Sequence, residues 1–167
     1  MQRKSWFRLS ALVVLAVLML PTAARTEDLV PIRLRYVGSF PPPEIISSNP
    51  LVVFTTDQLS GVGTHVGQFT GIYPHTINFD EGTFSGTATI TAANGDLLYI
   101  DLSGTGVPIS PTVFSINLQG TITGGTGRFE GAAGELSGTG TVDLAALEVS
   151  ATLEGDINKP DLPYEEP

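Results

Sequence analysis

The stretch that decides the fold is GGTGRFEGAAG, residues 124–134, which holds five glycines and a single aromatic residue, Phe129. Glycine adopts positive φ and tolerates close backbone approach, so this density predicts a tight, packed crossing between two strands. The segment that follows, residues 135–142, alternates with a period of two and predicts a strand. A glycine-rich loop can also hold phosphate, but that site needs a following helix and usually a Lys. The strand crossing is therefore the favoured interpretation.

The same run resembles the glycine-rich signature of the allene oxide cyclase and dirigent β-barrel superfamily, in which Gly-Gly-Thr-Gly-x-Phe-x-Gly-x-x-Gly links two barrel strands. The matching residues are Gly124, Gly125, Thr126, Gly127, Phe129, Gly131 and Gly134. With the strand pattern described below, the resemblance covers residues 61–157. It implies a fold rather than a reaction, because the catalytic polar residues of that superfamily lie on other strands and none is carried over here. Secreted bacterial members of unassigned function look like this chain.

A weak repeat organises the body of the chain. A large apolar residue, any residue and then a glycine recur at spacings of 15 to 18 residues. That interval fits one long strand and one turn and is too short for a helical crossover, so it predicts an antiparallel meander. With one or two strands upstream, at residues 32–37 and 51–54, we expect an all-β, closed antiparallel barrel of about seven to eight strands. The copies of the repeat begin at Phe69, Phe84, Leu102, Leu118, Leu136 and Leu153.

The turn at Asn94-Gly95 tests the register of this meander. A two-residue type I′ turn would set Ile90 opposite Tyr99 and expose a whole apolar row. A three-residue loop over residues 93–95, with Gly95 in the left-handed region, instead pairs Ile90 with Leu98. We favour the three-residue loop, because it keeps both strands' apolar residues on one face.

The turn at Glu81-Gly82 decides which way Tyr73 and His75 face. A two-residue turn at Glu81-Gly82 would pair Phe79 with Phe84 and turn Tyr73 and His75 toward the barrel interior. Pro74 lies between them and lacks a backbone donor, so a bulge there would reverse which way the upstream residues face.

The N-terminus predicts export. Basic residues precede an apolar run over residues 9–20, and small residues at 22–24 fit a cleavage site, so residues 1–24 are predicted to be a signal peptide. The run is too short for an ordinary membrane anchor, so we expect a secreted protein, extracellular or periplasmic, with no membrane contact after cleavage. Residues 25–60 are expected to hold N-terminal strands and a Pro-rich linker. Residues 61–157 form the barrel body, or 31–157 with the N-terminal strands, and 158–167 a disordered tail.

Composition excludes several classes of function. The net charge is −9 and becomes more acidic once Arg3, Lys4 and Arg8 leave with the signal peptide, so nucleic-acid binding is not expected. The chain has no Cys, no Gly-x-Ser-x-Gly motif and only two histidines, His65 and His75. We therefore predict no disulfide, no cofactor and no metal site, and a cation held by Asp143 and Glu148 is a weaker alternative than a solvated turn.

Three residues are candidates for ligand binding: Tyr73, His75 and Arg128. An inward imidazole and phenol need partners, which are either protein groups, the favoured interpretation, or a bound molecule. Arg128 is the only Lys or Arg between residues 36 and 158, and it could anchor a carboxylate. A surface pair with Glu130 or Glu135 is the favoured alternative for it.

We expect this barrel to bind a small, largely apolar molecule without catalysis, because small barrels commonly enclose one ligand and inward glycines leave space. An isomerase or cyclase of the allene oxide cyclase type is the main alternative that the resemblance implies. A structural or interaction module, assembled as a homo-oligomer through the barrel wall, is a third. A barrel filled by Phe69, Phe84 and Phe114 would favour that third class, whereas a cavity with converging polar groups would favour the first two.

Overall fold

The computed structural model of the protein describes residues 29–158, so the predicted signal peptide and residues 159–167 of the predicted tail lie outside the described residues. Residues 29–158 form nine strands and one short 3-10 helix. The strands are β1 (Leu29–Ser39), β2 (Glu44–Ser48), β3 (Leu51–Gly63), β4 (Gly67–Asn78), β5 (Thr83–Ala92), β6 (Leu97–Pro108), β7 (Val113–Gly125), β8 (Gly134–Asp143) and β9 (Glu148–Asn158), and the helix is η1 (Gly127–Phe129).

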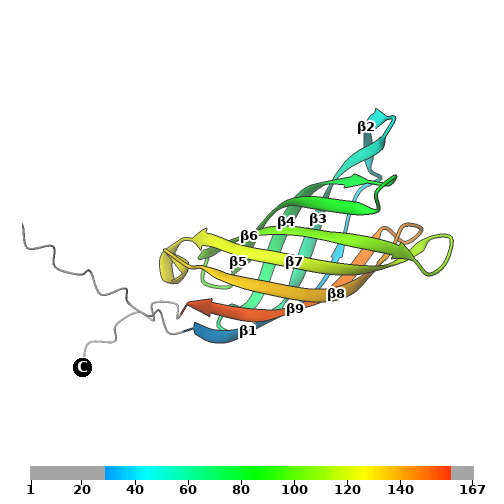
Figure 1. The fold of residues 1–167 in the computed structure, drawn as a ribbon. Helices are drawn as coiled ribbons and strands as arrows, with labels where there is room; N and C mark the ends of the chain where they lie inside the picture. The colour runs from blue at the N-terminus through cyan, green and yellow to red at the C-terminus, as the bar shows by residue number, and fades with distance from the viewer. Residues whose placement is uncertain (1–28, 159–167) are drawn as a thin grey trace, which may run out of the picture.

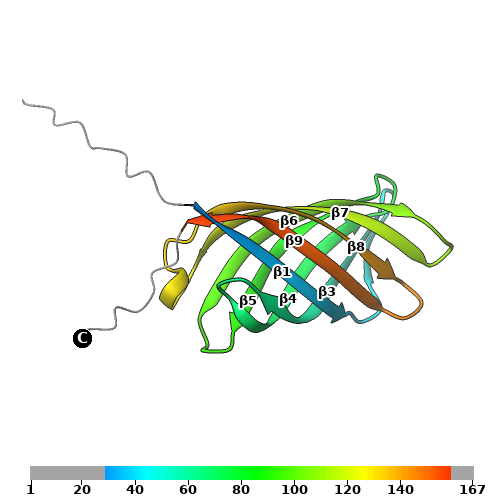
Figure 2. The same ribbon diagram turned by 90° about the horizontal axis from the view of Figure 1, so that it is seen from below.

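The strands form a closed antiparallel barrel. Consecutive strands pair from β3 to β9, β9 pairs with β1, and β1 pairs with β3, so eight strands close on themselves. The strand β2 pairs with β3 alone and projects beyond the barrel at one end (Figure 1). Seen from below, the strands cross the barrel axis obliquely, as closure of a twisted sheet requires (Figure 2). The predicted closed all-β barrel is confirmed.

Alternation along each strand builds the core. In β1, Ile32, Leu34 and Tyr36 are buried while Arg33 and Arg35 between them are exposed. The predicted strand at residues 51–54 is the start of a longer strand that runs to Gly63 and forms part of the barrel wall. One face of each of the eight barrel strands thus lines the interior, and that face is apolar over most of its length.

The glycine-rich stretch forms the predicted crossing between β7 and β8. Gly124, Gly127 and Gly131 have φ values of 142°, 56° and 71°, the left-handed region that favours glycine. Phe129, the last residue of η1, is fully buried in the core. Hydrogen bonds tie the loop to the neighbouring turn, since the Thr126 hydroxyl accepts from the backbone N–H of Leu97 at 2.9 Å. The stretch is an architectural closure of this end of the barrel.

The register predicted for the turn at residues 93–95 is confirmed, and the register predicted for the turn at Glu81-Gly82 is corrected. Ile90 pairs with Leu98, and Gly95 has a φ of 89°, as the three-residue loop requires. The turn between β4 and β5 is four residues long rather than two, so Phe84 lies opposite Ile77 and not Phe79. The side chain of Asn78 causes this difference, because its Oδ1 accepts from the backbone N–H of Asp80 at 3.1 Å and thereby builds the longer turn.

A shift of two residues preserves which face each residue occupies. Tyr73 and His75 therefore point inward as predicted, and Pro74 introduces no shift of register between β4 and β5. Gly86 lies opposite His75, where a Cβ atom would come within 2.8 Å of the His75 Cα atom. Its missing side chain lets the two strands approach beside the candidate site. Within residues 29–158, no helix is long and apolar enough to cross a membrane.

Candidate functional site

A cavity of about 460 Å³ occupies the end of the barrel opposite η1. Its walls come from the strands and from the β4–β5 turn, and most of them are aromatic or aliphatic. The interior is therefore not plugged by its phenylalanines: Phe84 and Phe114 line the cavity, while Phe69 is buried in the core. The aromatic lining residues are Tyr36, Phe40, Tyr73, Phe79, Phe84 and Phe114.

The polar feature of this cavity that sequence reasoning missed is Asp57 on β3. Its residue surface is only 6% exposed, and its Oδ1 atom is buried with no hydrogen-bond partner among the described residues. Burial raises the pKa of Asp57 to about 7, because the low-dielectric interior disfavours the carboxylate. A buried carboxyl oxygen without a hydrogen bond is costly, and a bound ligand or a reaction is one of the explanations for such an atom in native proteins.

His75 lies beside this carboxyl group without forming a hydrogen bond to it. Its Nδ1 atom is 3.9 Å from Asp57 Oδ1 and 3.0 Å from the carbonyl oxygen of Tyr73. Because a carbonyl oxygen only accepts, Nδ1 carries the proton and Nε2 of the neutral ring is an acceptor. Burial lowers the pKa of His75, against a smaller opposite effect of its hydrogen bond to the Tyr73 backbone. Burial thus moves Asp57 and His75 toward their neutral forms. Their separation of 3.9 Å therefore does not by itself make an ion pair.

Two tyrosines, Tyr36 and Tyr73, lie in the cavity together with Asp57 and His75. The hydroxyl of Tyr73 donates to the backbone oxygen of Leu102 at 3.1 Å, and its ring stacks on His75 with the centroids 4.3 Å apart. Burial, and secondarily the charge of Asp57, raises the pKa of Tyr36. Burial also raises the pKa of Tyr73, and the charges of Tyr36 and Asp57 raise it further by smaller amounts. Both phenols remain neutral over the whole physiological range.

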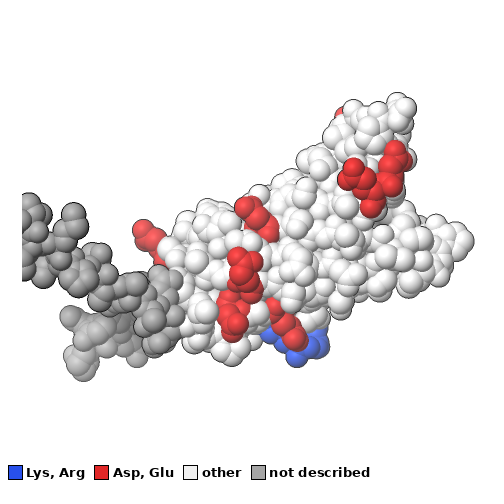
Figure 3. Space-filling view, in the orientation of Figure 1, with Lys and Arg blue, Asp and Glu red and all other residues white. Residues whose placement is uncertain are grey.

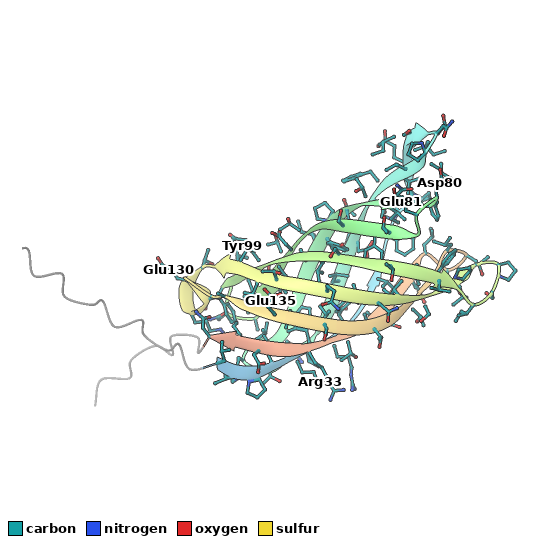
Figure 4. All side chains as sticks on the ribbon, in the orientation of Figure 1. Arg33, Asp80, Glu81, Tyr99, Glu130 and Glu135 are labelled. Carbon is teal, nitrogen blue, oxygen red and sulfur yellow. The ribbon has the colours of Figure 1, made fainter. Side chains whose placement is uncertain are left out.

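The rim of the cavity carries two more carboxylates, Asp80 and Glu81 of the β4–β5 turn. Figure 4 labels both at the end of the barrel that lies opposite Glu130, which belongs to the η1 end. Asp80 Oδ2 accepts from the backbone N–H of Leu51 at 3.3 Å, and Glu81 Oε2 accepts from the Thr83 hydroxyl at 3.4 Å. These bonds fix the turn and with it the shape of the rim.

The third predicted ligand-binding residue, Arg128, does not line this cavity. It belongs to η1, where its guanidinium donates to the backbone oxygen of Val66 at 2.9 Å and lies 4.8 Å from the Phe129 ring centroid. Its charged partner is Asp96, with Nε and Oδ2 3.7 Å apart, and not Glu130 or Glu135 as the sequence suggested. Asp96 reaches it because the β5–β6 turn packs against the glycine-rich crossing.

A signal for Asp57 was present in the sequence. The buried side of β3 holds every second residue: Val53, Thr55, Asp57 and Leu59. Extending the predicted strand beyond residue 54 would have put Asp57 on its apolar face.

Asp143 and Glu148 do lie opposite each other across the β8–β9 turn. Within residues 29–158, no three His, Cys, Asp or Glu side chains gather as a metal site would require.

The fold is that of a dirigent-like barrel. The chain is similar to the solved structure of the pterocarpan synthase dirigent protein PsPTS1, with a TM-score of 0.50 and 18% identity over 81% of this chain and 98% of that one. It is also similar to the pterocarpan synthase dirigent protein GePTS1, with a TM-score of 0.47 and 19% identity over 84% and 90% of the two chains. No protein-family profile and no curated protein sequence matches. The predicted resemblance to the allene oxide cyclase and dirigent barrels is confirmed for the fold.

Proposed function

We propose that this protein binds one small, largely apolar molecule in the open end of its barrel. The observation that supports this function best is the cavity of about 460 Å³, which combines aromatic walls with a buried carboxyl group whose Oδ1 atom has no hydrogen-bond partner among the described residues. Ligand pockets of this size commonly combine apolar walls with a few polar groups that orient the ligand. We also propose that the protein acts outside the cytoplasm, on the strength of its N-terminal sequence.

A fluorescence titration with the neutral probe N-phenyl-1-naphthylamine tests this function. Gly106 lines the cavity, and a Cβ atom there would meet only Ile116 and Phe114, at 3.7 and 3.9 Å. Gly106→Leu should therefore fill part of the cavity without moving the backbone and weaken probe binding by about tenfold or more. The matched control is Thr105→Leu, which adds a similar side chain to the exposed face of the same strand. Equal binding by wild type and both variants would exclude the cavity as the site.

An isomerase or cyclase is the second candidate, and the Asp57–His75 pair favours it. A buried carboxyl group with a pKa of about 7 beside an imidazole with a lowered pKa is suited to proton transfer near neutral pH. Native mass spectrometry of the protein purified from its own source, followed by chromatographic separation of the released molecule into its isomers, would distinguish the two candidates. A molecule that is retained and released unchanged supports binding, whereas a mixture of isomers that Asp57→Asn no longer produces supports catalysis.

A further inference from the structure

The charges that surround the cavity all have the same sign. Its lining includes Asp57 inside and Asp80 and Glu81 at the rim, and no Lys or Arg of the described residues contributes to it. Arg33, Arg35 and Arg128 are the Lys and Arg residues within 29–158, and Arg33 is paired with Glu154 at 2.9 Å. Figure 3 shows the same imbalance on one face of the molecule, where acidic groups far outnumber basic ones. A cavity in such a field attracts cations and repels anions.

The interior of the cavity suits a cation for a second reason. Six aromatic rings line it, and aromatic faces attract ammonium groups through their quadrupoles, most strongly where water is excluded. Its buried carboxyl group has an oxygen without a hydrogen bond among the described residues. His75 does not neutralise that group, because its Nδ1 proton is donated to the Tyr73 backbone.

We propose that the ligand of this cavity is a hydrophobic amine whose ammonium group pairs with the Asp57 carboxylate while its apolar body packs on the aromatic walls. This inference rests on the proposed function and names the chemical class of the ligand. An ammonium group supplies the donors that the carboxylate lacks and compensates for its burial. A ligand carboxylate would instead meet Asp57 and two rim carboxylates of like charge.

The pairing makes binding dependent on pH. The groups that face Asp57 are Tyr36 from β1 and Tyr73 and His75 from β4, with Asp80 and Glu81 farther out at the rim. Both tyrosines stay neutral, and His75 is neutral over most of the range in which Asp57 ionises. Amine affinity should therefore fall as the pH drops below 7, by about tenfold per pH unit once the carboxyl is protonated.

Calorimetric titrations with three ligands of one skeleton test the proposal: 2-(1-naphthyl)ethylamine, 2-(1-naphthyl)ethanol and 1-naphthylacetate. At pH 8 the amine should bind wild type at least about tenfold more tightly than the alcohol, and the alcohol more tightly than the carboxylate. Asp57→Asn should abolish the advantage of the amine and leave alcohol affinity within about threefold. Asp156→Asn, which removes an exposed carboxylate on β9, should change none of the three.

The outcomes separate this proposal from the proposed function. If the alcohol binds as tightly as the amine, or if Asp57→Asn retains the preference, the amine class is wrong and the cavity remains a binding site. If neither these ligands nor the neutral naphthylamine probe binds, both proposals are wrong. Should Asp57→Asn fail to fold, the comparison of wild type at pH 8 and pH 5.5 decides, because only amine binding should weaken strongly in acid.

Discussion

Asp57 Oδ1 and His75 Nδ1 lie 3.9 Å apart in the barrel interior, and no hydrogen bond joins them. The His75 proton is directed to the Tyr73 backbone oxygen, so it does not reach Asp57 Oδ1, which has no hydrogen-bond partner among the described residues. This relationship explains why burial moves the pKa of Asp57 upward and that of His75 downward, since neither group stabilises the charge of the other strongly enough.

Asp57→Asn should change the pH dependence of stability. The pKa of Asp57 is raised from 3.8 to about 7, so the folded protein holds this proton more tightly than the unfolded chain. Below about pH 4 both states are protonated and the shift has no effect. As the pH rises through the window from 4 to 7, ionisation favours the unfolded chain, and wild type should lose up to about 4 kcal/mol of unfolding free energy.

Urea denaturation at several pH values between 4 and 8 measures this effect. The stability of Asp57→Asn minus that of wild type should increase with pH across the window, because asparagine does not ionise. Asp156→Asn, on the exposed face of β9, serves as the control. A difference that stays constant with pH would mean that Asp57 is solvated in solution.

The glycine-rich crossing should be intolerant of larger side chains. Gly127→Val and Gly131→Val should each lower the unfolding free energy by about 1 to 3 kcal/mol, since both positions have positive φ. Phe129→Ala should cost about 3 to 5 kcal/mol, because the ring is fully buried. Chemical denaturation measures all three, and Glu130→Ala, an exposed neighbour, should stay within about 0.5 kcal/mol of wild type. An unchanged unfolding free energy for the first three would show that the loop does not close the barrel.

The fold was predictable because sequence patterns over short stretches of the chain determine which residues form strands and how neighbouring strands pair. The alternation of apolar and polar residues within the strands, the spacing of the glycines and the three-residue loop at residues 93–95 each agree with the observed pairing. The β4–β5 register was not predictable from Glu81-Gly82 alone, because a side-chain bond of Asn78 lengthens that turn. The extra strand β2 was missed because it follows three prolines and makes only a short pairing with β3.

The site was only half predictable. The parity of β4 correctly turned Tyr73 and His75 inward, since a two-residue shift of register leaves parity unchanged. Asp57 was missed because it lies beyond the apolar stretch that marked the start of β3. Arg128 was grouped with the site because it is an isolated cation, but tertiary packing of two turns places it against Val66 and Asp96 at the other end.

Processing of the N-terminus is a prediction of the sequence alone. The exported protein should begin near Arg25, because Thr22 and Ala24 satisfy the requirement for small residues before the cleavage site. N-terminal sequencing of material recovered outside the cytoplasm measures this directly. Detection of Met1 on exported protein would exclude cleavage.

Tyr73→Phe should affect stability more than binding. The Tyr73 hydroxyl already donates to the backbone oxygen of Leu102, so its removal deletes a buried hydrogen bond and should cost about 1 to 2 kcal/mol. Affinity for the neutral naphthylamine probe should stay within about twofold, because the ring that lines the cavity is retained. His75→Leu should behave similarly toward this probe, since the imidazole proton is donated to the Tyr73 backbone and the new side chain is apolar. Both variants are compared at temperatures well below their melting points. A loss of probe affinity greater than about fivefold in Tyr73→Phe would mean that the hydroxyl leaves Leu102 to contact the ligand, which would restore Tyr73 as a ligand-orienting residue.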